Sequence, residues 1–99
     1  MNLQKLKEKL APKLHPIEVE GETIYIHRPT SRDFEKCTNA QSTLIICVKD
    51  ENGDPIFSEE DIEGRINVNS IDFVIQTKIY NDIFELISKS DRTDEVEKK

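Results

Sequence analysis

Residues 70–88, SIDFVIQTKIYNDIFELIS, are the stretch of sequence that decides the fold. Apolar residues recur in it at spacings of three and four. This spacing predicts an amphipathic helix that is capped by Asn69 or Ser70 and ends near Ser88. The apolar members are Ile71, Phe73, Val74, Ile75, Ile79, Tyr80, Ile83, Phe84, Leu86 and Ile87.

This helix carries more apolar surface than one core requires. With successive residues about 100° apart, its apolar residues mostly fill an arc of roughly 220°, whereas a helix lying on one core needs little more than 100°. Either the rest of the domain covers the whole arc, or part of it binds a partner. The second alternative predicts a partner-binding face with i, i+4 spacing. Its candidate residues are Ile71, Ile75, Ile79, Tyr80, Ile83, Phe84 and Ile87.

A hairpin is predicted near the N-terminus. Apolar and polar residues alternate through residues 17–26, IEVEGETIYI, and Gly21 lies between the two halves. A glycine between two alternating β-branched runs is typical of a β-hairpin. Because an isolated hairpin is at best marginally stable in water, its apolar face must cover a helix.

Two further helices are predicted between the hairpin and residue 69. Thr30 and Asp33 resemble a capping box and favour a helix over residues 31–48. The β-branched run TLIICV at its end leaves a strand open as the alternative there. Ser58 resembles another N-cap and predicts a short helix over residues 58–64.

The first residues of the chain predict a separate helical arm. Leu3, Leu6 and Leu10 recur at helical spacing, and Pro12 ends the helix near Leu10. A helix this short is marginal by itself, so the arm is either docked or frayed.

These elements predict an α+β fold. We expect a mainly helical single domain with an N-terminal β-hairpin packed on two longer helices and one short helix. The predicted division is an N-terminal helical arm at residues 1–16, a globular domain at 17–88 and a disordered polar tail at 89–99.

Charge narrows the classes of partner. The net charge is −6 and the pI is near 4.9, so the surface repels nucleic-acid phosphates and anionic membranes. Residues 1–16 carry four lysines against one glutamate, whereas residues 50–63 carry seven acids and no base. Each region taken alone is typical of ordinary solvated surface, and the two together leave head-to-tail contacts between copies as an alternative. No signal peptide or membrane-spanning segment is predicted.

No residue is predicted to bind a metal or to catalyse a reaction. Asp50, Asn52, Asp54 and Asp61 fall at calcium-ligand places of a twelve-residue loop, but Pro55 stands where that loop needs glycine. This stretch is therefore predicted to be a turn. The two cysteines and two histidines lack zinc spacing, and we expect reduced thiols, small and buried. The prediction is a protein that is not an enzyme, with no cofactor.

Two motifs carry a resemblance to a known family. The first is a V-x-V-x-G-x-x-V-x-V-R strand pair followed by x-T-x-x-x-x-D/E-x-F/Y, matched at Val19, Gly21, Ile24, Ile26, Arg28, Thr30 and Phe34. The second is an acidic D-E-D/N-G-x-x-L/F-F-S-x-E-D turn, matched at Asp50, Glu51, Asn52, Gly53, Ile56, Phe57, Ser58, Glu60 and Asp61. In this order the motifs resemble the small tail assembly chaperones of long-tailed bacteriophages, over residues 17–88. Pro29 departs from the pattern, since a Glu-Leu pair is common before the Thr.

The resemblance implies a function that composition does not. It implies a non-enzymatic chaperone that binds the tape measure protein, recruits major tail protein subunits to the tail tube and self-associates. Such a protein acts in the host cytoplasm and is absent from the mature virion. The alternative is a small acidic phage or bacterial regulator that inhibits a nucleic-acid enzyme by charge mimicry.

Overall fold

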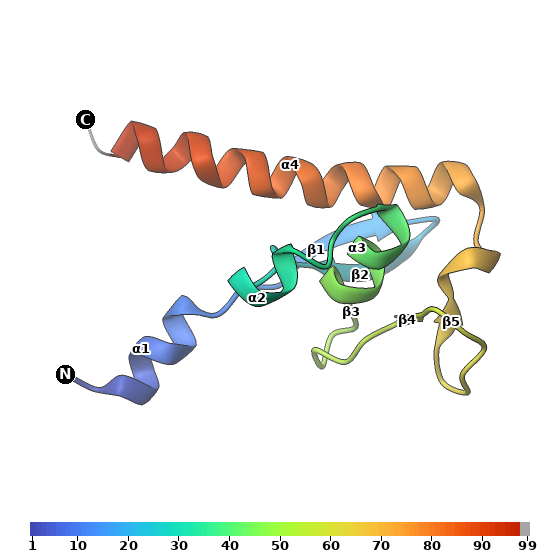
Figure 1. Cartoon of the computed structure of the whole chain (residues 1–99), viewed down its shortest axis with the longest axis horizontal. Coiled ribbons are helices and arrows are strands. Elements are labelled where there is room, and N and C mark those ends of the chain that lie inside the picture. Colours follow the sequence, from blue (N-terminus) through green and yellow to red (C-terminus); the bar gives the residue numbers. More distant parts are fainter. Residues whose placement is uncertain (98–99) are drawn as a thin grey trace.

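The core lies between a small antiparallel sheet, helix α3 and helix α4 (Figure 1). The computed structural model describes the backbone of residues 1–97 and the side chains of residues 1–89. In chain order the elements are α1 (Leu3–Leu10), β1 (His15–Val19), β2 (Glu22–Ile26), α2 (Ser31–Phe34), α3 (Ala40–Cys47), β3 (Val48–Lys49), β4 (Phe57–Ser58), β5 (Ile66–Asn67), the 3₁₀ helix η1 (Val68–Ser70) and α4 (Phe73–Glu97). The predicted α+β, mainly helical fold is confirmed.

The predicted hairpin is confirmed and gains a third strand. Strands β1 and β2 pair antiparallel, and β3 pairs antiparallel with the other edge of β2. The connection is a two-residue turn in which Glu20 has φ 51° and Gly21 has φ 84°. Positive φ at both positions is the geometry of a type I′ turn, which matches the twist of the flanking strands.

The helix predicted over residues 31–48 is wrong as a single element. Helix α2 is one turn long, and α3 starts again at Ala40. Between them Asn39 adopts an extended backbone, and its side chain accepts a hydrogen bond of 2.8 Å from the backbone N–H of Ser42. Ser42 Oγ accepts in return from the backbone N–H of Asn39, so a complete capping box starts the second helix.

The short helix predicted over residues 58–64 is also wrong. Ser58 belongs to strand β4, which pairs parallel with β5. Its hydroxyl is buried and donates to the backbone carbonyl of Glu60 instead of capping a helix. The predicted core of two longer helices and one short helix is therefore replaced by α3, α4 and a parallel strand pair.

Helix α4 begins three residues later than Ser70 and extends past Ser88 to Glu97. Asp72 is its cap, because Asp72 Oδ1 accepts hydrogen bonds from the backbone N–H groups of Val74 and Ile75. The predicted tail, residues 89–99, lies largely outside the residues whose side chains are described. The division into arm, domain and tail stays a prediction.

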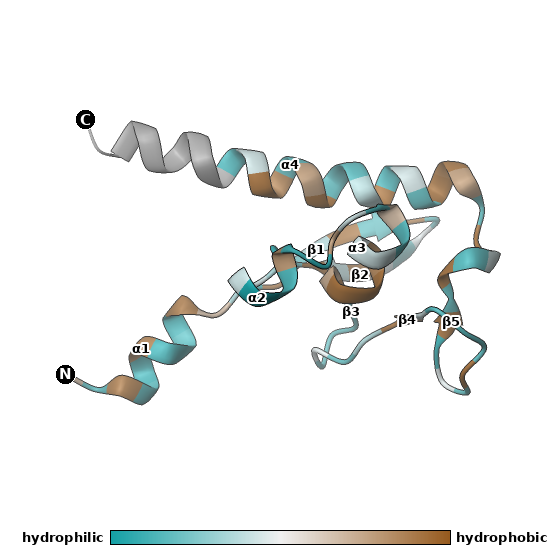
Figure 2. Ribbon diagram, in the orientation of Figure 1, coloured by the Kyte–Doolittle hydropathy of each residue, from teal (hydrophilic) through white to brown (hydrophobic). Residues whose placement is uncertain are grey.

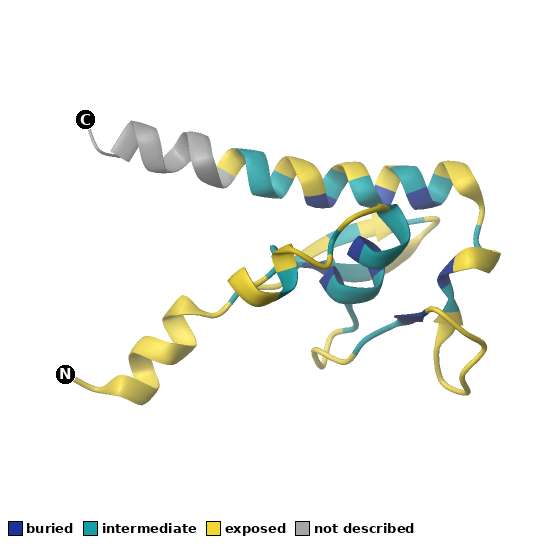
Figure 3. Ribbon diagram, viewed as in Figure 1, coloured by how far each residue is buried: buried dark blue, intermediate teal, exposed yellow. Residues whose placement is uncertain are grey.

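One apolar core joins the three-stranded sheet, α3, β4, η1 and α4. It is made of Ile26, Leu44, Cys47, Val48, Phe57, Val68, Ile79 and Ile83. Figure 2 shows apolar residues on both α3 and α4, and Figure 3 shows that the buried residues of α4 lie on the side turned toward α3 and the sheet. The sheet, α3 and α4 therefore form the body that positions the surfaces considered next.

Candidate protein-binding site

Helix α4 presents different surfaces on its different sides. Gln76, Ile79 and Ile83 follow one another at spacings of three and four and are buried. The amide of Gln76 stays satisfied in this environment, because Nε2 donates to the backbone carbonyl of Val68 over 3.3 Å. This side of α4 is used entirely by the core.

The residues of the predicted partner-binding face do not all lie on one side of α4, and some of them belong to the core. Ile79 and Ile83 are only 2% and 0% exposed, so neither can contact a partner while the chain is folded. Ile71 and Ile75 are half-buried and pack against the core. The i, i+4 line of isoleucines is therefore not a docking surface, and the core accounts for that part of the excess apolar arc.

The other predicted residues lie together on a neighbouring side of α4. Tyr80, Phe84 and Ile87 are joined there by Phe73 and Thr77, so that the spacing is four, three, four and three. We call these five residues the seam. Phe73 is 76% exposed and Phe84 is 58% exposed, whereas Thr77, Tyr80 and Ile87 are half-buried, and Tyr80 and Ile87 also pack against the core. A 3.5-residue repeat of this kind is the pattern by which one helix packs along another.

Helix α2 lies against the C-terminal half of the seam and forms a groove with it. The cavity has a volume of about 190 Å³ and is lined by Phe34, Cys37, Thr43, Tyr80, Ile83, Phe84 and Ile87. We call it the aromatic groove. Phe34 is itself 60% exposed, and the groove shares Tyr80, Phe84 and Ile87 with the seam.

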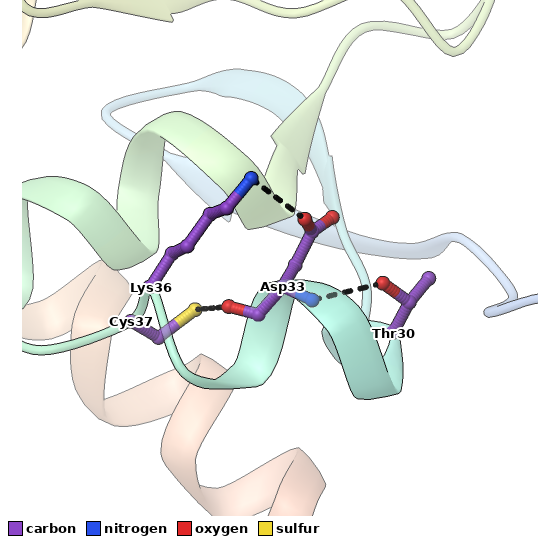
Figure 4. A network of polar contacts seen from close by, with 4 residues as sticks. All are labelled: Thr30, Asp33, Lys36 and Cys37. Carbon is purple, nitrogen blue, oxygen red and sulfur yellow. Dashed lines mark hydrogen bonds and ion pairs between the residues drawn. The ribbon is translucent and has the colours of Figure 1, made fainter.

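Local hydrogen bonds hold α2 in place beside the groove (Figure 4). Thr30 Oγ1 accepts from the backbone N–H of Asp33 over 3.2 Å, which confirms the predicted cap. Cys37 Sγ lies 3.5 Å from the carbonyl oxygen of Asp33, and the Lys36 ammonium lies 3.9 Å from the Asp33 carboxylate. These contacts fix the turn that carries Phe34.

The two cysteines are free thiols. Cys47 is buried, as predicted, whereas Cys37 is only half-buried and lines the groove. Burial, followed by the neighbouring Cys37, raises the pKa of the Cys47 thiol to about 12. Cys47 therefore stays protonated near neutral pH and behaves as a core residue rather than a nucleophile.

A second polar pair lies where the sheet meets α3. His27 Nδ1 lies 2.7 Å from the carbonyl oxygen of Arg28, and His27 Nε2 lies 3.0 Å from the Lys49 ammonium. The imidazole is therefore neutral, donating from Nδ1 and accepting at Nε2. Burial lowers the pKa of His27, and burial likewise lowers the pKa of Lys49. The Lys49 ammonium also donates to the carbonyl of Ile46, so both groups are used in the fold.

The acidic stretch after β3 is a turn, as predicted. Asp50 Oδ1 accepts from the backbone N–H groups of Asn52 and Asp54 over 2.8 and 2.9 Å. Gly53 has φ 85°, which permits the reversal of the chain. The Asp50 carboxylate thus accepts hydrogen bonds from the backbone of the turn. Within the described part of the chain, no group of three or more His, Cys, Asp or Glu side chains is placed to hold a metal.

Sequence reasoning missed two members of this surface. Phe73 is one of the predicted apolar residues of the helix but is not assigned to the partner face, and Phe34 falls within the single helix predicted over residues 31–48 and is assigned to no site. The four–three spacing of the seam was visible in the sequence. The position of Phe34 was not, because it depends on the break before Asn39.

Comparison with known proteins yields no relative. No family model, curated protein or solved structure matches this chain. Over the residues that the structure describes, no helix is both long enough and apolar enough to cross a membrane.

Proposed function

We propose that this chain is a non-enzymatic protein-binding chaperone of phage tail assembly. It binds the tape measure protein and recruits tail tube subunits. The observation that carries the proposal is the seam on α4, in which Phe73 and Phe84 are exposed, with the aromatic groove beside it. The motifs at residues 17–34 and 50–61 supply the family to which this binding role is assigned.

The seam favours a helical partner. Its residues span positions 73 to 87, which corresponds to about 21 Å along an α-helix. A partner helix that repeats apolar residues every seven positions can pack along this length. Because tape measure proteins are long and helical, as the resemblance implies, they offer many such segments.

The composition of the surface suits strong contacts. Buried aromatic side chains each remove roughly 150–250 Å² from water and dominate binding energy at interfaces. Phe34, Phe73 and Phe84 are the exposed aromatic residues of the seam and groove. The solvated side of α4 carries polar residues. Two of them, Lys78 and Asp82, form an ion pair with an N–O distance of 3.0 Å.

The test is co-purification with overlapping segments of the tape measure protein. Phe73→Ser and Phe84→Ser each weaken binding by about 2 kcal/mol, as expected for interface anchors. Val74→Ser is the matched control, because Val74 is 72% exposed on the same helix but lies outside the seam. It leaves binding unchanged. Circular dichroism confirms that each variant stays folded.

Two results would count against the proposal. If the wild-type protein binds no segment of the tape measure protein, the proposed partner is wrong. If the Phe84→Ser and Val74→Ser variants bind equally well, the seam is not the binding surface. If the wild type instead inhibits a nucleic-acid enzyme and loses that activity when acids of residues 50–63 are neutralised, charge mimicry is the better account.

A further inference from the structure

Helix α1 is unpartnered within the chain. It has no buried residue, and Leu3 and Leu10 are 70% and 74% exposed. Figure 1 shows it extending away from the sheet and from α4. A helix of this length is marginal in water by itself. A contact with another molecule would therefore stabilise the helix and bury its leucine side chains.

The groove beside α1 has a defined chemical character. It measures about 870 Å³ and lies between α1 and residues 28–31. We call it the basic groove. Its apolar residues are Leu3, Leu6, Leu10, Ala11, Pro12 and Pro29, and every charged residue on its wall is basic: Lys7, Lys9, Lys13 and Arg28. It fits an acidic segment that also carries exposed aliphatic side chains.

The chain itself contains such a segment. Residues 59–66, which we call the acidic loop, are exposed throughout and run from the end of β4 to Ile66, the first residue of β5. Ile62 and Ile66 are 50% and 48% exposed in this loop. They are surrounded in sequence by Glu59, Glu60, Asp61 and Glu63, with Arg65 as the one base of the segment.

The two surfaces cannot meet within one molecule. The acidic loop and α1 lie at opposite ends of the chain as seen in Figure 1, and the longest dimension of the protein is 43 Å. Both surfaces are exposed where they lie. They are therefore complementary only between separate copies.

We propose that the basic groove of one copy binds the acidic loop of the next copy. The four bases of the groove face the four acids of the loop, and Ile62 enters between the leucines of α1. Because the two surfaces differ, the contact is heterologous, and each added copy leaves one groove and one loop free. The product is an open head-to-tail chain of copies rather than a closed symmetric dimer.

The contact is weak and depends on salt. A groove along an eight-residue helix is smaller than the roughly 800 Å² per partner of a standard interface, so association is transient. Charged pairs at its rim are screened at about 1 M salt, where the Debye length is about 3 Å, and act at full range at about 0.01 M. Sedimentation velocity over a concentration series therefore shows progressive growth in low salt and its suppression in high salt.

Matched charge reversals locate the groove. Lys9→Glu abolishes the concentration-dependent growth, because Lys9 lines the groove. Lys5→Glu makes the same change on the same helix at a lysine that does not line it, and it retains growth. A result in which both variants lose assembly equally would assign the effect to net charge and overturn the proposed groove.

Mixing two variants tests the polarity of the contact. Leu10→Ser disables the groove and Ile62→Ser disables the loop, and each variant alone stays monomeric. Mixed together, they stop at a one-to-one dimer, because one intact groove and one intact loop remain. A symmetric dimer made by either variant alone, or a mixture that stays monomeric, overturns the proposal.

Two further outcomes would also overturn it. One is wild-type protein that stays monomeric at every concentration in low salt. The other is wild-type protein that stays monomeric but sediments with vesicles of anionic phospholipid through α1, which would make the basic helix a membrane-surface element. The contact uses neither the seam nor the aromatic groove. Its failure and the failure of the proposed function are therefore separate results.

Discussion

At the scale of single residues, adjacent side chains of α4 have opposite roles. Ile83 is in the core, whereas Phe84, the next residue, belongs to the exposed seam. The larger aromatic side chain is thus the one that faces water. This difference is 100° of rotation about the helix axis, and it separates residues that stabilise the fold from residues available to a partner.

Truncation of these two residues has unequal effects on stability. Ile83→Ala lowers the free energy of unfolding by about 2–5 kcal/mol, because it removes buried methylenes and leaves a cavity. Phe84→Ala changes it by about 0.5 kcal/mol or less, as expected at an exposed position. Urea unfolding measures both. Equal losses would contradict the assignment of Phe84 to the surface.

His27 makes stability depend on pH. Burial lowers the pKa of His27 below 6.5, the Lys49 charge lowers it further, and the hydrogen bond with the Arg28 carbonyl opposes the shift. The unfolded chain therefore binds this proton more readily than the folded chain. The stabilising contribution is complete above pH 6.5 and is lost as the pH falls from 6.5 toward the lower folded pKa.

Urea unfolding over a pH series measures this effect. The midpoint for the wild type falls as the pH is lowered through the range in which histidine titrates. His27→Gln keeps an acceptor for Lys49 without the titration, so its midpoint changes less. An identical pH dependence in the wild type and the variant would show that His27 is not the responsible group.

At the scale of elements, the type I′ turn between β1 and β2 places a non-glycine residue in an unfavourable backbone conformation. Glu20 holds φ 51°, a region that costs non-glycine residues roughly 1–2 kcal/mol and that asparagine tolerates better. Glu20→Asn therefore raises the free energy of unfolding by up to about 1 kcal/mol, measured by thermal unfolding. Glu22→Asn is the control, since it removes the same charge from an exposed strand position and brings no such gain.

The elements differ in how far the sequence predicts them. The hairpin and α1 follow from local signals, namely alternation around Gly21 and leucines that end before Pro12, and both predictions are confirmed. The break between α2 and α3 was missed because apolar residues keep helical spacing across it. The Asn39–Ser42 capping box overrides that spacing.

The error at Ser58 has a different physical cause. The pairing of β4 with β5 joins residues that are not adjacent in sequence, and no local pattern specifies a parallel pair of two residues each. The candidate site was predicted in part for the same reason. Of the predicted residues, Phe84 is exposed and Tyr80 and Ile87 are half-buried beside it, and the choice between two neighbouring apolar sides of α4 depended on where α3 packs.

At the scale of the whole molecule, α1 is separable from the core. Because none of its residues is buried, removal of residues 1–12 leaves the thermal unfolding midpoint unchanged. The same deletion abolishes head-to-tail growth, because it removes most of the basic groove. Differential scanning calorimetry and sedimentation velocity check the two parts. A clearly lower midpoint would show that α1 contributes to the core after all.

The spacing of the seam also sets the geometry of whatever helix lies on it. A repeat of 3.5 residues falls slightly short of the 3.6 residues in a straight helical turn, so two helices joined along it cross at about 20° and wind around each other with a left hand. Copies placed at regular intervals on one long partner helix would then be rotated progressively about its axis. Such a coat would be a spiral, with its pitch determined by the partner helix rather than by this protein.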